Sequence, residues 1–125
     1  QQVLTTPELA WIFAADTLAE VTVSGQIKSK DVMGLIDRLI ITDRKITVVD
    51  YKTNLTVPEV PEQTPEAILR QMGAYAALLR DIYPGREIET GILWTRNATY
   101  MTLPHLLVNE ALERSPKLDA GLPGS

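Results

Sequence analysis

The chain has 125 residues, of which 45% are hydrophobic and 22% charged, as expected for one globular domain with a real core. It has no cysteine, which excludes disulfides, cysteine-ligated zinc and iron–sulfur clusters from these residues and fits a reducing compartment. No apolar run approaches the roughly 18 residues of a membrane span, so no membrane partner is expected. The formal net charge of −4 disfavours autonomous nucleic-acid binding, which ordinarily needs a basic surface.

The first predicted elements are a short helix or turn over residues 6–13 and a strand over residues 21–28. Thr6 suits the N-cap of the helix, because its hydroxyl can accept a hydrogen bond from a free backbone N–H. The strand follows from the alternation of apolar and polar residues. A turn at residues 29–30 is expected to join this strand to the next one in an antiparallel pair.

Two β-branched runs, 34–41 and 46–53, flank a polar turn and predict a β-hairpin. If the turn centres on residues 43–44, Asp37 lies opposite Asp50. Directly opposed side chains in an antiparallel pair have Cβ atoms about 4.5–5.5 Å apart. Two carboxylates at that separation repel each other unless something neutralises them, and a divalent cation is the usual reason to tolerate such a pair.

Lys52 completes a candidate site on this hairpin. Side chains alternate along a strand, so Lys52 projects from the same face as Asp50. The simpler interpretation is a surface acid at Asp37 and a strand-end ion pair between Asp50 and Lys52. Residues 32–41 are apolar on both faces, which instead predicts a buried central strand, and a buried carboxylate needs a partner or a metal. Two acids and an ammonium on one surface are typical of phosphodiester hydrolysis.

Glu20 is a further acidic candidate for the same face. With a turn at residues 29–30, Thr22 lies opposite Asp37 and Glu20 lies one step along that face. The simpler interpretation of Glu20 is a surface acid at the start of a strand.

The remaining sequence predicts a long helix, two strands and a second helix. An apolar stripe at helical spacing places the long helix over residues 65–83, with Thr64 as a plausible N-cap. Strands over 87–95 and 99–103 and a helix over 104–113 follow. This order predicts an α/β (α+β) fold, in which a long helix packs across a mixed central sheet.

Three motifs together resemble a known family. They are Ile36-Asp37-Arg38, Val49-Asp50-Tyr51-Lys52-Thr53-Asn54 and Gln71-Met72-Gly73-Ala74-Tyr75. Their order and spacing resemble the RecB-type branch of the PD-(D/E)XK nucleases over roughly residues 20–80. The run from Tyr83 to Thr95 extends the likeness to the C-terminal nuclease domain of AddA, the helicase–nuclease component of bacterial AddAB. The resemblance implies a restriction-endonuclease-like fold.

The same resemblance implies roles for individual residues. Asp37 and Asp50 would bind Mg²⁺, for which Mn²⁺ can substitute, with the Tyr51 carbonyl as a further ligand. Lys52 would orient or activate the attacking water and stabilise developing charge, as metal-assisted hydrolysis requires.

Gln71 and Tyr75 stand one helical turn apart on a common face. The resemblance implies that they line the site and position the DNA strand, whereas the simpler interpretation is a polar pair covering the sheet edge. The family usually carries a metal-binding histidine on a helix before the first strand. The only histidine in this sequence is His105, far downstream, and we interpret it as a helix-start residue.

The function implied is an Mg²⁺-dependent DNA exonuclease domain of an ATP-dependent helicase–nuclease. Such an enzyme acts in double-strand break repair and recombination in the bacterial cytoplasm, together with an AddB-like partner protein. The sequence lacks the Gly-x-x-x-x-Gly-Lys-Ser/Thr phosphate loop, so no ATP site is expected in these residues. We expect residues 1–114 to form the nuclease core, as a fragment without the upstream helix, and residues 115–125 to form a loose tail.

Two alternatives remain open. The chain would also suit a catalytically inactive RecB-like module that serves a structural or DNA-guiding role, which the intact acidic pair and lysine disfavour. Small stand-alone relatives and AddB itself typically hold an iron–sulfur cluster through cysteines, and the absence of cysteine counts against both.

Overall fold

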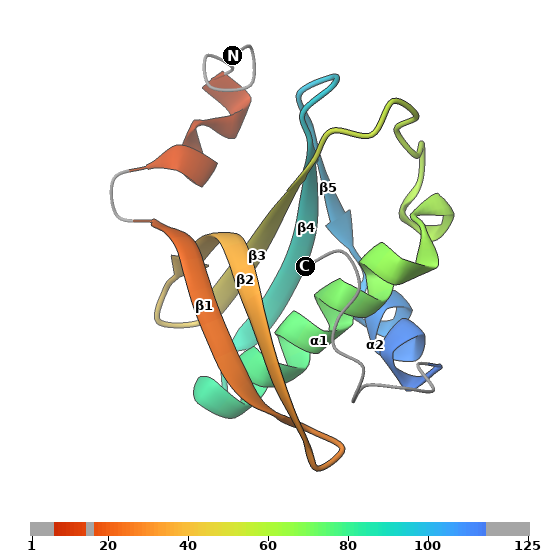
Figure 1. Ribbon diagram of the computed structural model, residues 1–125. Helices are drawn as coiled ribbons and strands as arrows, with labels where there is room; N and C mark the ends of the chain where they lie inside the picture. The colour runs from red at the N-terminus through yellow and green to blue at the C-terminus, as the bar shows by residue number, and fades with distance from the viewer. Residues whose placement is uncertain (1–6, 15–16, 115–125) are drawn as a thin grey trace.

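The computed structural model describes residues 7–14 and 17–114 (Figure 1). The elements in chain order are η2 (Pro7–Phe13), β1 (Leu18–Ile27), β2 (Lys30–Ile41), β3 (Lys45–Lys52), η3 (Pro61–Gln63), α1 (Glu66–Ile82), β4 (Glu87–Trp94), β5 (Thr99–Leu103) and α2 (His105–Glu113). Thr6 and the predicted tail over residues 115–125 lie outside the described residues. In the part of the chain that is described, no helix is long and apolar enough to cross a membrane.

The five strands form one mixed sheet in the order β1-β2-β3-β4-β5. Neighbouring strands are antiparallel except β3 and β4, which are parallel. Parallel strands need a long crossover, and α1 provides it by lying across one face of the sheet with α2 beside it (Figure 1). The predicted mixed sheet with a long helix packed across it is confirmed.

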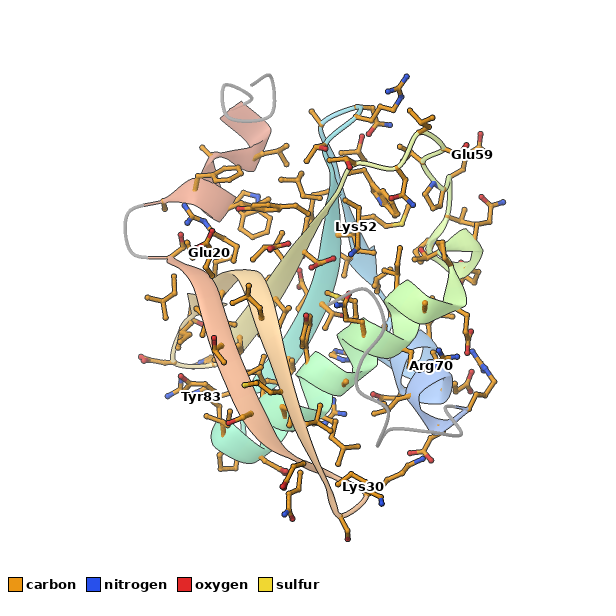
Figure 2. All side chains as sticks on the ribbon, viewed as in Figure 1. Glu20, Lys30, Lys52, Glu59, Arg70 and Tyr83 are labelled. Atoms are coloured by element: carbon orange, nitrogen blue, oxygen red, sulfur yellow. The ribbon has the colours of Figure 1, made fainter. Side chains whose placement is uncertain are left out.

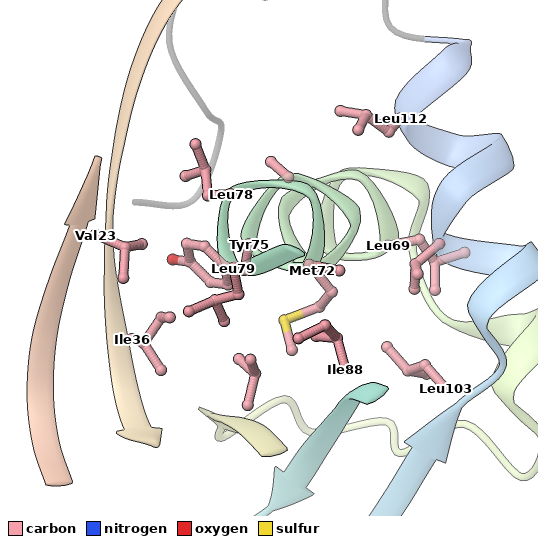
Figure 3. Packing of buried hydrophobic residues seen from close by; sticks show 14 of the residues in the cluster. Val23, Ile36, Leu69, Met72, Tyr75, Leu78, Leu79, Ile88, Leu103 and Leu112 are labelled. Carbon is pink, nitrogen blue, oxygen red and sulfur yellow. The ribbon is translucent and has the colours of Figure 1, made fainter. Parts of the chain in front are cut away.

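The main core lies between α1 and the sheet. Met72, Tyr75 and Leu79 of α1 are almost completely buried and face Ile36 of β2 and Ile88 of β4 (Figure 3). Burying an apolar side chain of this size stabilises a fold by about 1.5–3 kcal/mol. The apolar stripe that predicted the helix is therefore the surface that attaches it to the sheet.

A smaller apolar cluster covers the opposite face of the sheet. Leu9 and Ile12 of η2 pack there against Val49 of β3 and Leu93 of β4. β3 is consequently buried on both faces, which explains why its residues are apolar on both sides.

The prediction that β2 is likewise buried on both faces is wrong for its first half. Met33 and Leu35 are 67% and 51% exposed, while Val32 and Ile36 on the α1 side are buried. The reason is that η2 reaches only the last part of β2, where Arg38 Nε donates a hydrogen bond to the carbonyl of Ile12 at 3.0 Å.

The turn between β1 and β2 lies one residue earlier than predicted. Lys28 and Ser29 occupy it with φ values of 52° and 67°, and positive φ at both central residues gives the turn a twist that matches the flanking strands. The register shifts with the turn, so Thr22 pairs with Leu35 and the predicted opposition of Thr22 and Asp37 is wrong.

The start of α1 also differs from the prediction. Pro65 occupies the N-cap and makes no side-chain cap, so the predicted cap by Thr64 is wrong. Thr64 instead ends η3, where its N–H donates to the carbonyl of Pro61 at 3.0 Å. The backbone of Thr64 is therefore committed to the preceding turn.

Candidate active site

Asp37 lies where the pairing of β2 with β3 stops. The predicted hairpin register is confirmed by the pairs Leu39–Val48 and Arg38–Val49, the second of which is the last pair of the ladder. Directly beyond it, Oδ2 of Asp37 accepts a hydrogen bond from the backbone N–H of Tyr51 at 2.8 Å. The carboxylate takes the place of a backbone acceptor, and this bond fixes it against β3.

The regular alternation of side chains along β2 is broken at Asp37. Ile36 lies in the core beneath α1, whereas Arg38, two residues later, bonds to η2 on the other face. A regular strand would place these two side chains on one face. On the neighbouring strand, Glu20 sits opposite Asp37, between the pairs 21–36 and 19–38, and has a φ of 54°. Local breaks of this kind re-aim side chains and are common beside active sites.

Asp50 is a buried acid near the end of β3. It is 5% exposed, and its Oδ2 lies 2.9 Å from Nζ of Lys52. Burial raises the pKa of Asp50 to about 6, the Lys52 ammonium opposes that rise, and the nearby Asp37 carboxylate adds to it. The structure therefore brings Asp37, Asp50 and Lys52 together, as the hairpin predicted.

The contact between Lys52 and Asp50 leaves hydrogen-bonding capacity on the carboxylate. The 2.9 Å separation defines an ion pair, but Oδ2 has no partner with hydrogen-bond geometry among the described residues. Both observations hold, because charge attraction does not depend on angle whereas a hydrogen bond does. A buried oxygen with a free lone pair needs a further partner, and a metal ion is one.

The donor set fits Mg²⁺ or Mn²⁺. The N–H of Tyr51 points to Asp37, and since the N–H and C=O of one strand residue point to the same side, its carbonyl faces β2 beyond the last ladder pair. Within the described ranges no group of three or more His, Cys, Asp or Glu side chains is placed to hold a metal. Two carboxylates, one carbonyl and several waters suit Mg²⁺, which keeps much of its hydration shell.

Gln71 and Tyr75 approach the carboxylates from α1. Both are almost fully buried, and the Tyr75 hydroxyl donates to the carbonyl of Leu35 at 2.9 Å. Burial, and then the charges of Asp50 and Asp37, raise the pKa of Tyr75 to about 12, while the adjacent Gln71 side chain acts in the opposite direction. Tyr75 lies against β2, an inner strand of the sheet, and the role of the pair toward DNA stays a prediction.

Gly34 makes this approach possible. A Cβ atom at Gly34 would collide with the aromatic ring of Tyr75, so the ring rests directly on the backbone of β2. Gly34 is not among the site residues predicted from the sequence. The available signal was a glycine inside an otherwise apolar strand, which often marks a close approach of another group.

Two further residues from the sequence analysis have clear positions. Glu20 is exposed and opposite Asp37, and a part in metal binding stays a prediction. His105 is the exposed first residue of α2, so its interpretation as a helix-start residue is confirmed.

Comparisons with known proteins bear on the family and the fold. The model of the PD-(D/E)XK nuclease superfamily matches residues 4–118. One component of an ATP-dependent helicase/nuclease from Oenococcus oeni is 34% identical over 71 residues, which are 54% of this chain and 6% of that protein. A crystal structure from Eubacterium rectale, provisionally assigned as an exonuclease, has a TM-score of 0.65 at 11% identity over 90% of this chain and 45% of that one. The structural match confirms the restriction-endonuclease-like fold, and the chain spans only a small part of the protein from Oenococcus oeni.

Proposed function

The chain belongs to the PD-(D/E)XK nuclease superfamily, and from that premise we propose that it is an Mg²⁺-dependent DNA exonuclease domain. The observation that carries the proposal is the buried Asp50 carboxylate, which lies beside Asp37 and 2.9 Å from the Lys52 ammonium. A buried acid and a half-buried acid beside one lysine leave excess negative charge, and a bound cation relieves it.

Each residue of the site has a proposed task. Asp37, Asp50 and the Tyr51 carbonyl would hold the metal, which would supply Lewis-acid chemistry toward water and phosphate when bound. Lys52 orients the attacking water and stabilises the negative charge that develops on the phosphate. Gln71 and Tyr75 line the site from α1 and position the strand, a role supported by the influence of both carboxylates on the pKa of Tyr75 and by the contact of Gln71 with Tyr75.

We further propose that this domain acts within a larger ATP-dependent helicase–nuclease in double-strand break repair and recombination. The support is its similarity to the helicase/nuclease component from Oenococcus oeni and its net charge of −4, which suits a domain to which DNA is delivered. An AddB-like partner protein and a bacterial cytoplasmic location belong to the same proposal. The ATP site would lie outside these residues.

The first test is calorimetric titration of the chain with Mn²⁺ or Mg²⁺ beside the Asp37→Ala and Lys52→Ala variants. We expect saturable binding in the wild type, loss of at least tenfold in affinity in Asp37→Ala, and nearly unchanged affinity in Lys52→Ala. Cleavage of single-stranded DNA by the full-length enzyme is expected to disappear in both variants, because Lys52 acts on the reaction and Asp37 on the metal.

The opposite results have definite meanings. Equal metal affinity in wild type and Asp37→Ala would place the metal elsewhere and overturn the assignment. Metal binding by a full-length enzyme that cleaves no DNA would favour the inactive RecB-like structural or DNA-guiding module instead.

A further inference from the structure

We infer that the loop between β3 and α1 forms a pocket that receives a nucleobase of the DNA strand, one nucleotide away from the phosphate at Lys52. The inference rests on the proposed nuclease function and adds a binding site to it. The pocket has a volume of about 500 Å³, within the roughly 300–1,000 Å³ that is usual for small-molecule sites. Its lining includes Asn54, Thr56, Val57, Pro58, Gln63 and Pro65.

The pocket begins immediately beyond the proposed catalytic lysine. Asn54 follows Lys52 by two residues, and two residues span at most about 7 Å of chain. Glu59, which also lines the pocket, is labelled in the same upper half of the molecule as Lys52 in Figure 2. A strand whose phosphate contacts Lys52 therefore places a neighbouring nucleotide within reach of the pocket.

The chemistry of the lining suits a base and disfavours a phosphate. Val57, Pro58 and Pro65 offer apolar surface to the flat face of a base, and the amides of Asn54 and Gln63 offer both donors and acceptors to its edge. The residues described as lining the pocket include no lysine or arginine, and they include Glu59, whose charge repels a phosphate.

The walls of the pocket are already organised. The N–H of Glu59 donates to Oε1 of Gln63 at 3.1 Å, which ties the two sides of the loop together and leaves the Gln63 amide nitrogen for other partners. Val57 packs against the main core. A preorganised site loses less conformational entropy on binding than a flexible loop does.

The test is an abasic scan of single-stranded DNA binding. Oligonucleotides that each lack one base, at successive positions, are titrated against the full-length enzyme in Ca²⁺ and followed by fluorescence anisotropy. We expect one position to weaken binding about tenfold in the wild type. Thr56→Trp fills the pocket and Asn54→Ala removes an amide. In both variants, loss of the base at that position should no longer weaken binding more than loss of any other base.

Leu55→Ala is the matched control, because Leu55 is in the same loop, is 78% exposed and does not line the pocket.

The outcomes separate this inference from the nuclease proposal. Tight binding with equal affinities for all abasic oligonucleotides would overturn the pocket and leave the nuclease proposal intact. Loss of the position effect in Leu55→Ala as well would assign it to the loop as a whole and would also overturn the pocket. A full-length enzyme that neither binds DNA nor cleaves it in Mg²⁺ would overturn both.

Discussion

Asp50 shows how burial and charge compete at a single residue. Its environment disfavours the charged form through desolvation and through Asp37, and only Lys52 favours that form. Proteins retain such conflicts where a function requires them, and strongly shifted acids are candidates for functional sites. The raised pKa of Asp50 indicates a functional site because Asp37 and Lys52 lie beside this acid.

The raised pKa of Asp50 predicts a pH dependence of stability in the metal-free protein. Between its usual value of 3.8 and about 6, the native state holds a proton that the unfolded chain has released. The contribution of this group to the free energy of unfolding therefore falls as the pH rises through that window, by at most about 3 kcal/mol. Urea unfolding at pH 4.5 and 6.5 should show this decline in the wild type and a flatter response in Asp50→Asn. An identical pH response in the two proteins would contradict the assignment.

Glu20 supplies a second test at the residue scale. Its φ of 54° lies in the left-handed region, which costs a non-glycine residue roughly 1–2 kcal/mol. We expect Glu20→Gly to raise the free energy of unfolding by up to about 1 kcal/mol, since glycine adopts this conformation without strain but also loosens the unfolded chain. Glu20→Gln should keep the strain, and comparing its Mn²⁺ affinity with that of wild type tests the predicted assistance to the metal.

At the level of elements, β2 connects the two halves of the site. The break in side-chain alternation at Asp37 turns the carboxylate toward β3. Gly34 leaves room for the ring of Tyr75 from α1. The same tyrosine bonds to the carbonyl of Leu35, so α1 and β2 are joined two residues before Asp37. The position of the acid therefore depends on helix packing as well as on strand pairing.

Gly34→Ala tests this contact. In a strand with open space, replacing glycine by alanine stabilises a protein by about 0.4–1 kcal/mol. At Gly34 the added methyl would meet the buried Tyr75 ring, and we expect a loss of about 1–3 kcal/mol from overpacking. Chemical denaturation measures the change, and the loss should shrink in a Tyr75→Leu background. Met33→Ala, at a 67% exposed neighbouring position, is the control and should change stability by less than about 0.5 kcal/mol.

At the scale of the whole molecule, the site lies where β2, β3 and α1 meet near the end of β3. The sheet is held by α1 on one face and by η2 on part of the other. The net charge of −4 means that the molecule as a whole repels DNA. Recognition by the proposed domain must therefore come from the local arrangement of metal, lysine and loop.

Metal binding to this site should stabilise the entire fold. A ligand that binds only the native state adds about 2.7 kcal/mol when its free concentration is 100 times its dissociation constant, which for a chain of this size is a rise in Tm of roughly 10 °C. We expect calorimetric scans to show this rise with Mg²⁺ or Mn²⁺ and its reversal by EDTA. Asp37→Ala should show little or none of it, and an equal rise in that variant would mean that the metal binds elsewhere.

Local periodicity in the sequence was enough to predict much of this protein. Two β-branched runs around a polar turn predicted the hairpin register, and with it the grouping of Asp37, Asp50 and Lys52. Helical spacing predicted α1 and placed Gln71 and Tyr75 on one face. These features follow from the repeat of each element, which neighbouring residues specify.

The packing of elements that are distant in the sequence decides what covers each face of the sheet. It also decides where the regular alternation of side chains along a strand fails. The exposure of Met33 and Leu35 depends on how far η2 reaches, and the turn at Lys28 and Ser29 depends on the twist of the two strands. The break in side-chain alternation at Asp37 arises between the adjacent strands β1 and β2. The contact of Gly34 with Tyr75 joins elements about 40 residues apart. Burial is a property of the assembled fold, so the raised pKa of Asp50, and the site built on it, appear only when helix and sheet have packed.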